Sequence, residues 1–202
     1  GTGDAGRFSD QVVALNPVEG TERPLSSMHI GRALFEAVAY GGAIYVFGGK
    51  VGDWEGSGER LSRSVTDTIE RYDVASDTWT LLDVRMPLPR MVPAAVRIGR
   101  WALLFDGQPR NDALQMSSVW VFDLETEVFV QNNWISPYAA WSGGAVLVGD
   151  TVYLAGGNQL VYRKDRPGFF TMEHTIVNRF VSFHPSLPPG MDAGEDVPRT
   201  VY

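Results

Sequence analysis

The chain has 202 residues, of which 44% are hydrophobic and 20% charged, with a formal net charge of −7 and no cysteine. This composition is typical of a globular domain, and the lack of cysteine excludes disulfides and thiolate metal sites within these residues. The negative charge argues against a general nucleic-acid binder, and no apolar run of about 18 residues is present for membrane insertion.

The first apolar run, Val12 to Leu15, predicts a short strand, and we assign residues 1–31 to the back half of a sheet unit. The phrase AIYVFGG follows, ending at Gly49. It recurs as WALLFDG ending at Gly107 and as TVYLAGG ending at Gly157. These intervals of about 58 and about 50 residues mark an internal repeat, which is typical of repeat architectures.

In the first full unit, residues 32–89, alternating apolar residues predict four strands near 34–39, 43–48, 67–73 and 78–82. The polar, glycine-containing segment 50–67 separates the second strand from the third. We expect it to project as a long loop, and such loops are often functional. A variable surface loop is the simpler interpretation of the same segment.

The second unit, residues 90–139, keeps the pattern, whereas the third, residues 140–187, is degenerate. Ala140 takes the place of the arginine that leads the other two units, and we align Phe180 with Tyr72 of the first unit. Segment 158–173 occupies the place of the 50–67 loop and has a basic tip. Residues 188–202 are rich in proline and acidic residues and predict an extended tail.

Three shared features resemble the kelch repeat. A leading arginine stands at Arg32 and Arg90, and a glycine doublet ends the second strand, with Asp106-Gly107 as a departure. An aromatic pair follows at one fixed spacing, as Tyr72 with Trp79 and Phe122 with Phe129. The resemblance implies an all-β fold, a kelch-type β-propeller segment of four-stranded antiparallel blades. The four aromatics are expected in the core, and the glycines at positive φ.

The number of blades is about three and a half, whereas closed propellers have about 4–8. The chain is therefore a segment of a longer propeller, or other chains complete it, or its ends pair in a compact four-blade ring. The first of these interpretations is favoured.

The sequence carries no pattern for a metal or a cofactor, and we predict neither. The three histidines are scattered without metal-ligand spacing, and no phosphate-binding loop or nucleophile motif is present. Some relatives in the kelch family are copper radical oxidases, but their site needs a cysteine that this chain lacks.

The kelch resemblance places the leading arginines at the start of the innermost strands, near the channel mouth. Two guanidinium groups there could clamp a carboxylate or phosphate, with apolar neighbours as anchors. We therefore predict a partner-binding face made of Arg32, Phe35, Arg90, Met91 and Trp141. The alternatives are that the arginines link adjacent blades and that the aromatics only pack.

The predicted function is a non-catalytic protein–protein interaction module or a structural subunit of a larger assembly. The partner would be an acidic peptide segment with an apolar anchor, or other chains completing the propeller. The alternative is a carbohydrate-active or mutarotase-type enzyme of the kelch-like class, working in the channel. The inner strands argue against it, because Glu36 and Arg97 are their few charges. Location is not assigned, with the cytoplasm as the default expectation.

Overall fold

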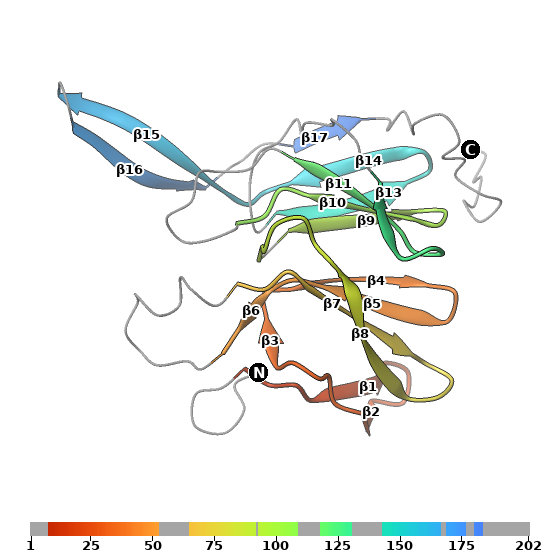
Figure 1. Cartoon of the computed structure of the whole chain (residues 1–202). Coiled ribbons are helices and arrows are strands. Elements are labelled where there is room, and N and C mark those ends of the chain that lie inside the picture. Colours follow the sequence, from red (N-terminus) through yellow and green to blue (C-terminus); the bar gives the residue numbers. More distant parts are fainter. Residues whose placement is uncertain are drawn as a thin grey trace. The chain divides into compact units, whose positions relative to one another are not determined.

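The computed structural model describes residues 8–52, 65–91, 93–108, 118–130, 143–166, 169–176 and 180–183. Each described element is a β-strand (Figure 1), so the predicted all-β class is confirmed. The chain forms two compact units, residues 1–91 with 109–111 and residues 92–108 with 112–202. In the described part of the chain, no helix is long and apolar enough to cross a membrane.

The first unit contains a complete four-stranded antiparallel blade in the order β4-β5-β7-β8 (Figure 1). Its strands are Glu36–Tyr40, Ala43–Phe47, Thr68–Asp73 and Thr78–Arg85. β5 is the most apolar of them and is buried over its last three residues, and both of its edges are paired, with β4 and with β7. All four strands lie where the sequence predicted them.

Two short paired segments extend this blade beyond the end of β4 and β5. Strand β3 (Arg32–Ala33) precedes β4, and β6 (Lys50–Val51) follows β5, and the two pair antiparallel. Lys50 also bridges to Val65. The two ends of the predicted 50–67 loop are therefore held together at the blade, while residues 53–64 lie outside the described residues.

A two-stranded hairpin precedes the blade in the first unit. Strand β1 (Val12–Asn16) pairs antiparallel with β2 (Thr21–Leu25) through a four-residue turn. The backbone before β1 is bonded to the segment that enters β3: the Met28 amide donates to Asp10 and the Arg32 amide to Ser9. The strand predicted at Val12 to Leu15 is thus confirmed.

The second unit contains another four-stranded blade, in the order β12-β11-β10-β9. Its strands, from the innermost outward, are Ala94–Ile98, Trp101–Phe105, Val119–Asp123 and Val128–Val130. Strand β10 is buried at every position. Residues 109–117, between β10 and β11, lie outside the described residues.

A third sheet in this unit has the order β13-β14-β17, with the strands Gly144–Val148, Thr151–Ala155 and Phe180–Phe183. A separate hairpin, β15 (Asn158–Arg166) with β16 (Phe169–Ile176), is inserted between β14 and β17. The segment compared with the 50–67 loop is therefore regular β-structure over most of its length. The predicted tail, residues 188–202, lies outside the described residues.

The two residues that follow the second strand have the same backbone conformation in all three sequence repeats. The φ angles are 63° and 100° at Gly48 and Gly49, and 68° and 98° at Gly156 and Gly157. Asp106 and Gly107 have 51° and 90°, so the aspartate keeps the left-handed geometry that glycine adopts without strain. The predicted equivalence of these positions is confirmed.

The pairing register of the third strand agrees with the sequence alignment in the first two sequence repeats and differs in the third repeat. Ile44 pairs with Tyr72 and Ala102 with Phe122, at matching distances before the glycines. In the third sequence repeat the matching residue, Val152, pairs with Phe183. The alignment of Phe180 with Tyr72 is therefore wrong by three residues, because the inserted hairpin sets the length between the paired strands.

Only two of the four aromatic residues predicted to lie in the core are fully buried. Tyr72 and Phe122 are buried, but Trp79 and Phe129 on the outer strands are only half-buried. Each pair is in ring contact, with centroids 5.0 Å apart for Tyr72 and Trp79 and 4.9 Å for Phe122 and Phe129. Trp79 and Phe129 therefore each pack against the aromatic ring of the neighbouring strand and remain partly exposed to solvent.

Candidate functional site

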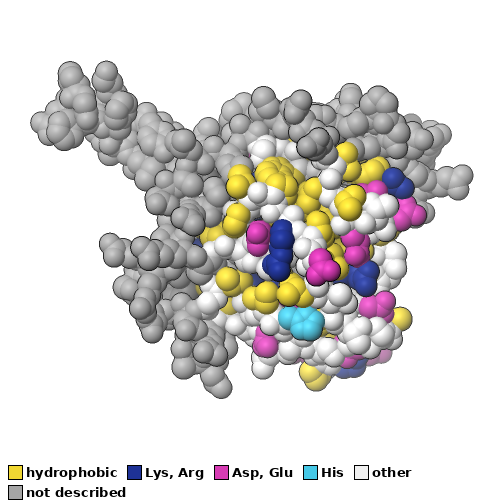
Figure 2. Space-filling view, in the orientation of Figure 1, with side chains coloured by type: hydrophobic (Ala, Val, Ile, Leu, Met, Phe, Trp, Pro, Cys, Tyr) yellow, Lys and Arg dark blue, Asp and Glu magenta, His cyan; other side chains and the backbone are white. Residues whose placement is uncertain are grey.

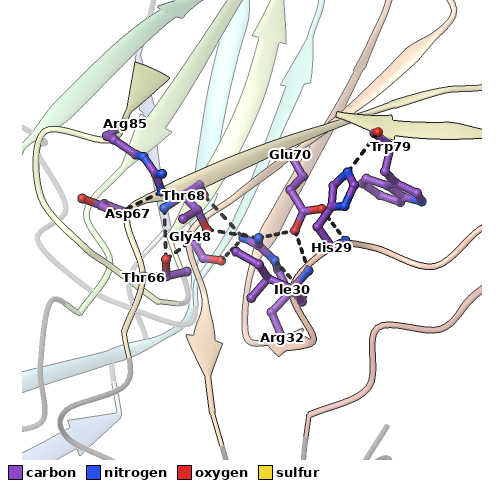
Figure 3. Close-up of polar contacts among 10 residues, drawn as sticks. All are labelled: His29, Ile30, Arg32, Gly48, Thr66, Asp67, Thr68, Glu70, Trp79 and Arg85. Carbon is purple, nitrogen blue, oxygen red and sulfur yellow. Dashed lines mark hydrogen bonds and ion pairs between the residues drawn. The ribbon is translucent and has the colours of Figure 1, made fainter. Parts of the chain in front are cut away.

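The guanidinium group of Arg32 organises the bend between β3 and β4. It lies fully buried and forms an ion pair with Glu70 of β7. It also donates to the Gly48 carbonyl at 2.8 Å and to the Thr68 hydroxyl at 3.1 Å, and Figure 3 shows these groups converging on it. A side chain on the short strand β3 therefore fastens the ends of β5 and β7.

The carboxylate of Glu70 also holds the chain that leads into β3. It accepts the backbone N–H of His29 at 2.7 Å and that of Ile30 at 3.2 Å (Figure 3). Burial lowers the pKa of Arg32, and the charge and hydrogen bond of Glu70 oppose this effect. Because arginine titrates far above neutrality, the Arg32 guanidinium stays charged, and removing one partner of a buried pair typically costs about 3–5 kcal/mol.

The bend leaves no room for a side chain at Gly49. A Cβ there would lie 2.7 Å from the Ala33 carbonyl oxygen and 3.0 Å from the Phe35 Cβ. The Gly49 N–H donates to the Arg90 carbonyl at 2.9 Å, and the Arg90 N–H donates to Thr66. These two backbone hydrogen bonds connect Gly49, after β5, and Thr66, before β7, to Arg90, and so hold the bend in place.

Leu34 and Phe35 form an exposed apolar corner at this bend. Leu34 has a φ of 56°, an uncommon conformation for a bulky residue and one that tends to mark functional sites. Leu34 is 48% exposed and Phe35 37% exposed. The hydrogen bonds beneath them make the corner rigid, which reduces the entropy lost when a partner binds.

Two partly buried charges flank the corner. Lys50 pairs across the sheet with Ala33, and burial lowers its pKa. Glu36 follows Phe35, and burial raises its pKa while a backbone hydrogen bond opposes the rise. Neither side chain forms an ion pair with any described residue. On the face drawn in Figure 2, basic and acidic side chains are interspersed with apolar ones.

The predicted partner-binding residues are distributed unevenly. Phe35 is exposed at the corner, whereas Arg32, Arg90 and Met91 are buried, at 2%, 0% and 3% exposure. Trp141 lies outside the described residues. The side-chain contacts of Arg32 are with its own blade, so they do not form the link between adjacent blades that was the alternative interpretation of this residue. That these five residues bind a partner remains a prediction.

Sequence reasoning missed Leu34 and Glu70 as parts of the corner, and it considered Lys50 only as the first residue of the 50–67 loop. Glu70 was visible within the repeated phrase Ile69-Glu70-Arg71-Tyr72, and a buried carboxylate in a β-strand requires a cation. The burial of Glu70, and with it the need for a cation, becomes evident only once the strands are placed. The positive φ of Leu34 carries no signal in the sequence, because leucine rarely adopts it.

The described residues do not hold a group of three or more histidine, aspartate or glutamate side chains able to bind a metal. His29 is exposed, and its Nε2 lies 3.1 Å from the Trp79 carbonyl oxygen. Arg97, the other charge on an inner strand, donates to the Gly99 carbonyl at 2.7 Å. These contacts give His29 and Arg97 structural partners.

A comparison with known protein families matches part of the repeat that the sequence analysis identified. Residues 31–82 match the family described as the Kelch motif, which covers the bend and most of the first blade. No curated protein matches the sequence. The chain is similar to a solved structure titled "Structure of YjhT", with a TM-score of 0.59 and 14% identity over 89% of this chain.

The likeness covers 66% of that structure, so this chain spans just under two thirds of its length. At this identity the likeness supports the fold and not an activity. Residues 31–82 thus match the Kelch motif, and the fold of the chain is similar to that of a kelch-type β-propeller.

Proposed function

We propose that this chain is a non-catalytic interaction module that binds a protein partner at the Leu34–Phe35 corner. The observation that carries the proposal is the exposure of two adjacent large apolar side chains on a rigid, strained bend. Rigid aromatic anchors of this kind dominate many protein interfaces. The Arg32–Glu70 pair then acts as a positioning device beneath the corner.

The proposed partner is an acidic peptide segment with an apolar anchor. Lys50 supports this chemistry, because a carboxylate from the partner would offset the cost of its partly buried charge. This role replaces the one predicted for the buried arginines. Arg90 and Met91 would act by holding the bend, and Trp141 remains a predicted further contact.

A library of random peptides displayed on phage, selected against the full chain, tests the proposal. We expect enrichment of sequences with a large apolar residue beside aspartate or glutamate. Phe35→Ala and Leu34→Asn should each weaken the selected peptide by about tenfold or more, since asparagine tolerates the positive φ. Lys50→Gln should weaken it by a smaller factor.

Val74→Ala is the matched control, because Val74 is an exposed apolar residue in the β7–β8 turn. It should leave binding and melting unchanged. Selection of basic peptides, or binding that survives Phe35→Ala, would contradict the proposal.

One observation favours the alternative, a carbohydrate-active or mutarotase-type enzyme. Glu36 lies at the start of an inner strand, and burial raises its pKa, as in many general acids. Incubation with reducing sugars, followed by NMR of the anomers, tests this function. Accelerated exchange that Glu36→Gln abolishes, while peptide binding is absent, would favour the enzyme over the interaction module.

A further inference from the structure

Strands β15 and β16 form a two-stranded sheet of their own (Figure 1). Their pairing runs from Asn158 with Ile176 at one end to Arg166 with Phe169 beside the turn. No other described strand pairs with either of them, so both edges of this hairpin are open among the described residues. A two-stranded hairpin alone is marginally stable in water, and a surface that covers part of it would therefore stabilise it.

The pairing register sorts the residues of the hairpin onto an apolar face and a polar face. Because successive residues of a strand alternate between the faces, every second cross-strand pair belongs to the same face. The apolar face holds the pairs Leu160 with His174, Tyr162 with Met172, and Lys164 with Phe170. The polar face holds the pairs Gln159 with Thr175, Val161 with Glu173, and Arg163 with Thr171.

The half of the hairpin beside the turn contains its basic and aromatic residues. Residues 162–166 and 169–172, the turn end, hold three cations, one aspartate and three aromatic residues. The cations are Arg163, Lys164 and Arg166, and the aromatics are Tyr162, Phe169 and Phe170. Residues 158–161 and 173–176 contain no lysine, arginine, phenylalanine, tyrosine or tryptophan. The turn end thus combines positive charge with apolar area, in a chain whose formal net charge is −7.

The cations are grouped around the end of the hairpin and not along one face. Lys164 belongs to the apolar face and Arg163 to the polar face. The register shifts between Lys164 and Arg166, so that Asp165 has no cross-strand partner. Positive charge is therefore available on both faces at the turn end, whereas the apolar residues are concentrated on one.

The combination of charge and apolar area defines the surface that fits this end. Clustered lysine and arginine residues are attracted to anionic lipid headgroups, and aromatic residues beside them are favourable at the boundary between headgroups and acyl chains. An acidic protein would satisfy the charges alone, whereas a bilayer holds anionic groups directly above an apolar layer. The open edges limit the depth, because unpaired backbone N–H and C=O groups do not enter the hydrocarbon.

We propose that the turn end of the β15–β16 hairpin docks on a membrane surface that carries anionic phospholipid headgroups. The cations bind the headgroups, and the aromatic residues contribute apolar area at headgroup depth. Binding of this kind needs no membrane-spanning segment. The rest of the chain is more negative than the whole and is repelled by the same surface, so the hairpin meets it end-on. This surface is separate from the Leu34–Phe35 corner and does not depend on the function proposed there.

Co-sedimentation of the full chain with vesicles of phosphatidylcholine containing about one third phosphatidylserine tests the proposal. We expect binding that weakens as salt is raised, and much weaker binding to phosphatidylcholine alone. Lys164→Gln should weaken binding by about fivefold, and neutralising all three cations to glutamine by about a hundredfold. Phe169→Ala together with Phe170→Ala should weaken it by about tenfold.

Two variants outside the hairpin are the matched controls. Arg23→Gln removes a positive charge from an exposed position of β2, and Val18→Ala removes apolar area from a residue that is 92% exposed in the β1–β2 turn. Each should change vesicle binding by less than about twofold. Melting curves identify a hairpin variant that does not fold, and the remaining hairpin variants then carry the test.

A polarity-sensitive fluorophore measures which part of the chain meets the lipid. Because the chain has no cysteine, Asp165→Cys and Glu19→Cys each create a single labelling site and each remove one acidic residue. With vesicles, emission from the label at position 165 should increase and shift to the blue. Emission from the label at position 19, in the β1–β2 turn, should stay unchanged.

Four results would overturn the proposal. The first is no sedimentation with the phosphatidylserine vesicles at low salt. The second is an equal loss of binding with Arg23→Gln and Lys164→Gln, which would indicate a general effect of charge. The third is full displacement from the vesicles by soluble glycerophosphoserine, which would indicate a site for a free phosphate ester. The fourth is binding of soluble polyglutamate without vesicle binding, which would assign the turn end to an acidic protein.

Discussion

Arg32 shows how one residue type suits two roles that the sequence does not separate. Its planar group can clamp a ligand carboxylate, and it can equally bind a carboxylate of its own sheet. The repeat places Arg32 at the start of a unit, but it does not show that β3 bends over the end of β7. The partner, Glu70, becomes identifiable only when both strands are placed.

The Arg32–Glu70 pair gives a prediction at the residue scale. Arg32→Met should lower the free energy of unfolding by about 3–5 kcal/mol, because Glu70 then stays buried without a cation. The double variant Arg32→Met with Glu70→Gln should lose less than the sum of the two single variants. Urea unfolding followed by tryptophan fluorescence measures all three, and strict additivity would show that the two groups do not interact.

At the scale of elements, the left-handed residues at strand ends and turns determine how each blade bends. Glycine doublets make some of these positions visible in the sequence. Asp106, Asp77, Glu127 and Leu34 adopt the same conformation without that signal. The sequence thus predicts the strands and the glycine positions, but not the exposed corner, whose geometry comes from hydrogen bonds between distant segments.

The bend at Gly48 can be tested against a glycine with the same backbone conformation. Gly48 and Gly41 have φ of 63° and 57°, so alanine should strain both by about 1–2 kcal/mol. Only at Gly48 would the new Cβ also meet the Arg90 carbonyl, the Met86 sulfur and the Thr66 carbonyl. Gly48→Ala should therefore cost clearly more than Gly41→Ala in urea unfolding, and equal costs would contradict the tight packing at the bend.

Over the whole molecule, the internal repeat is what made the fold predictable. It indicated the blades, the equivalent glycines and the match of Tyr72 with Phe122. It failed in the third unit, where the β15–β16 hairpin changes the chain length and Phe183 takes the position given to Phe180. Repeat spacing predicts register only where the loops between paired strands keep their length.

The division into two compact units gives the last prediction. Leu103 is fully buried in the core cluster of the second unit, and Leu103→Ala should cost about 2–5 kcal/mol there. Phe47 is fully buried in the first unit, and Phe47→Ala should cost about 3–5 kcal/mol. Hydrogen exchange should then rise mainly in β9–β14 for the first variant and mainly in β4–β8 for the second, since local stability follows local packing. An equal rise in both units for both variants would mean that the chain unfolds as one cooperative body.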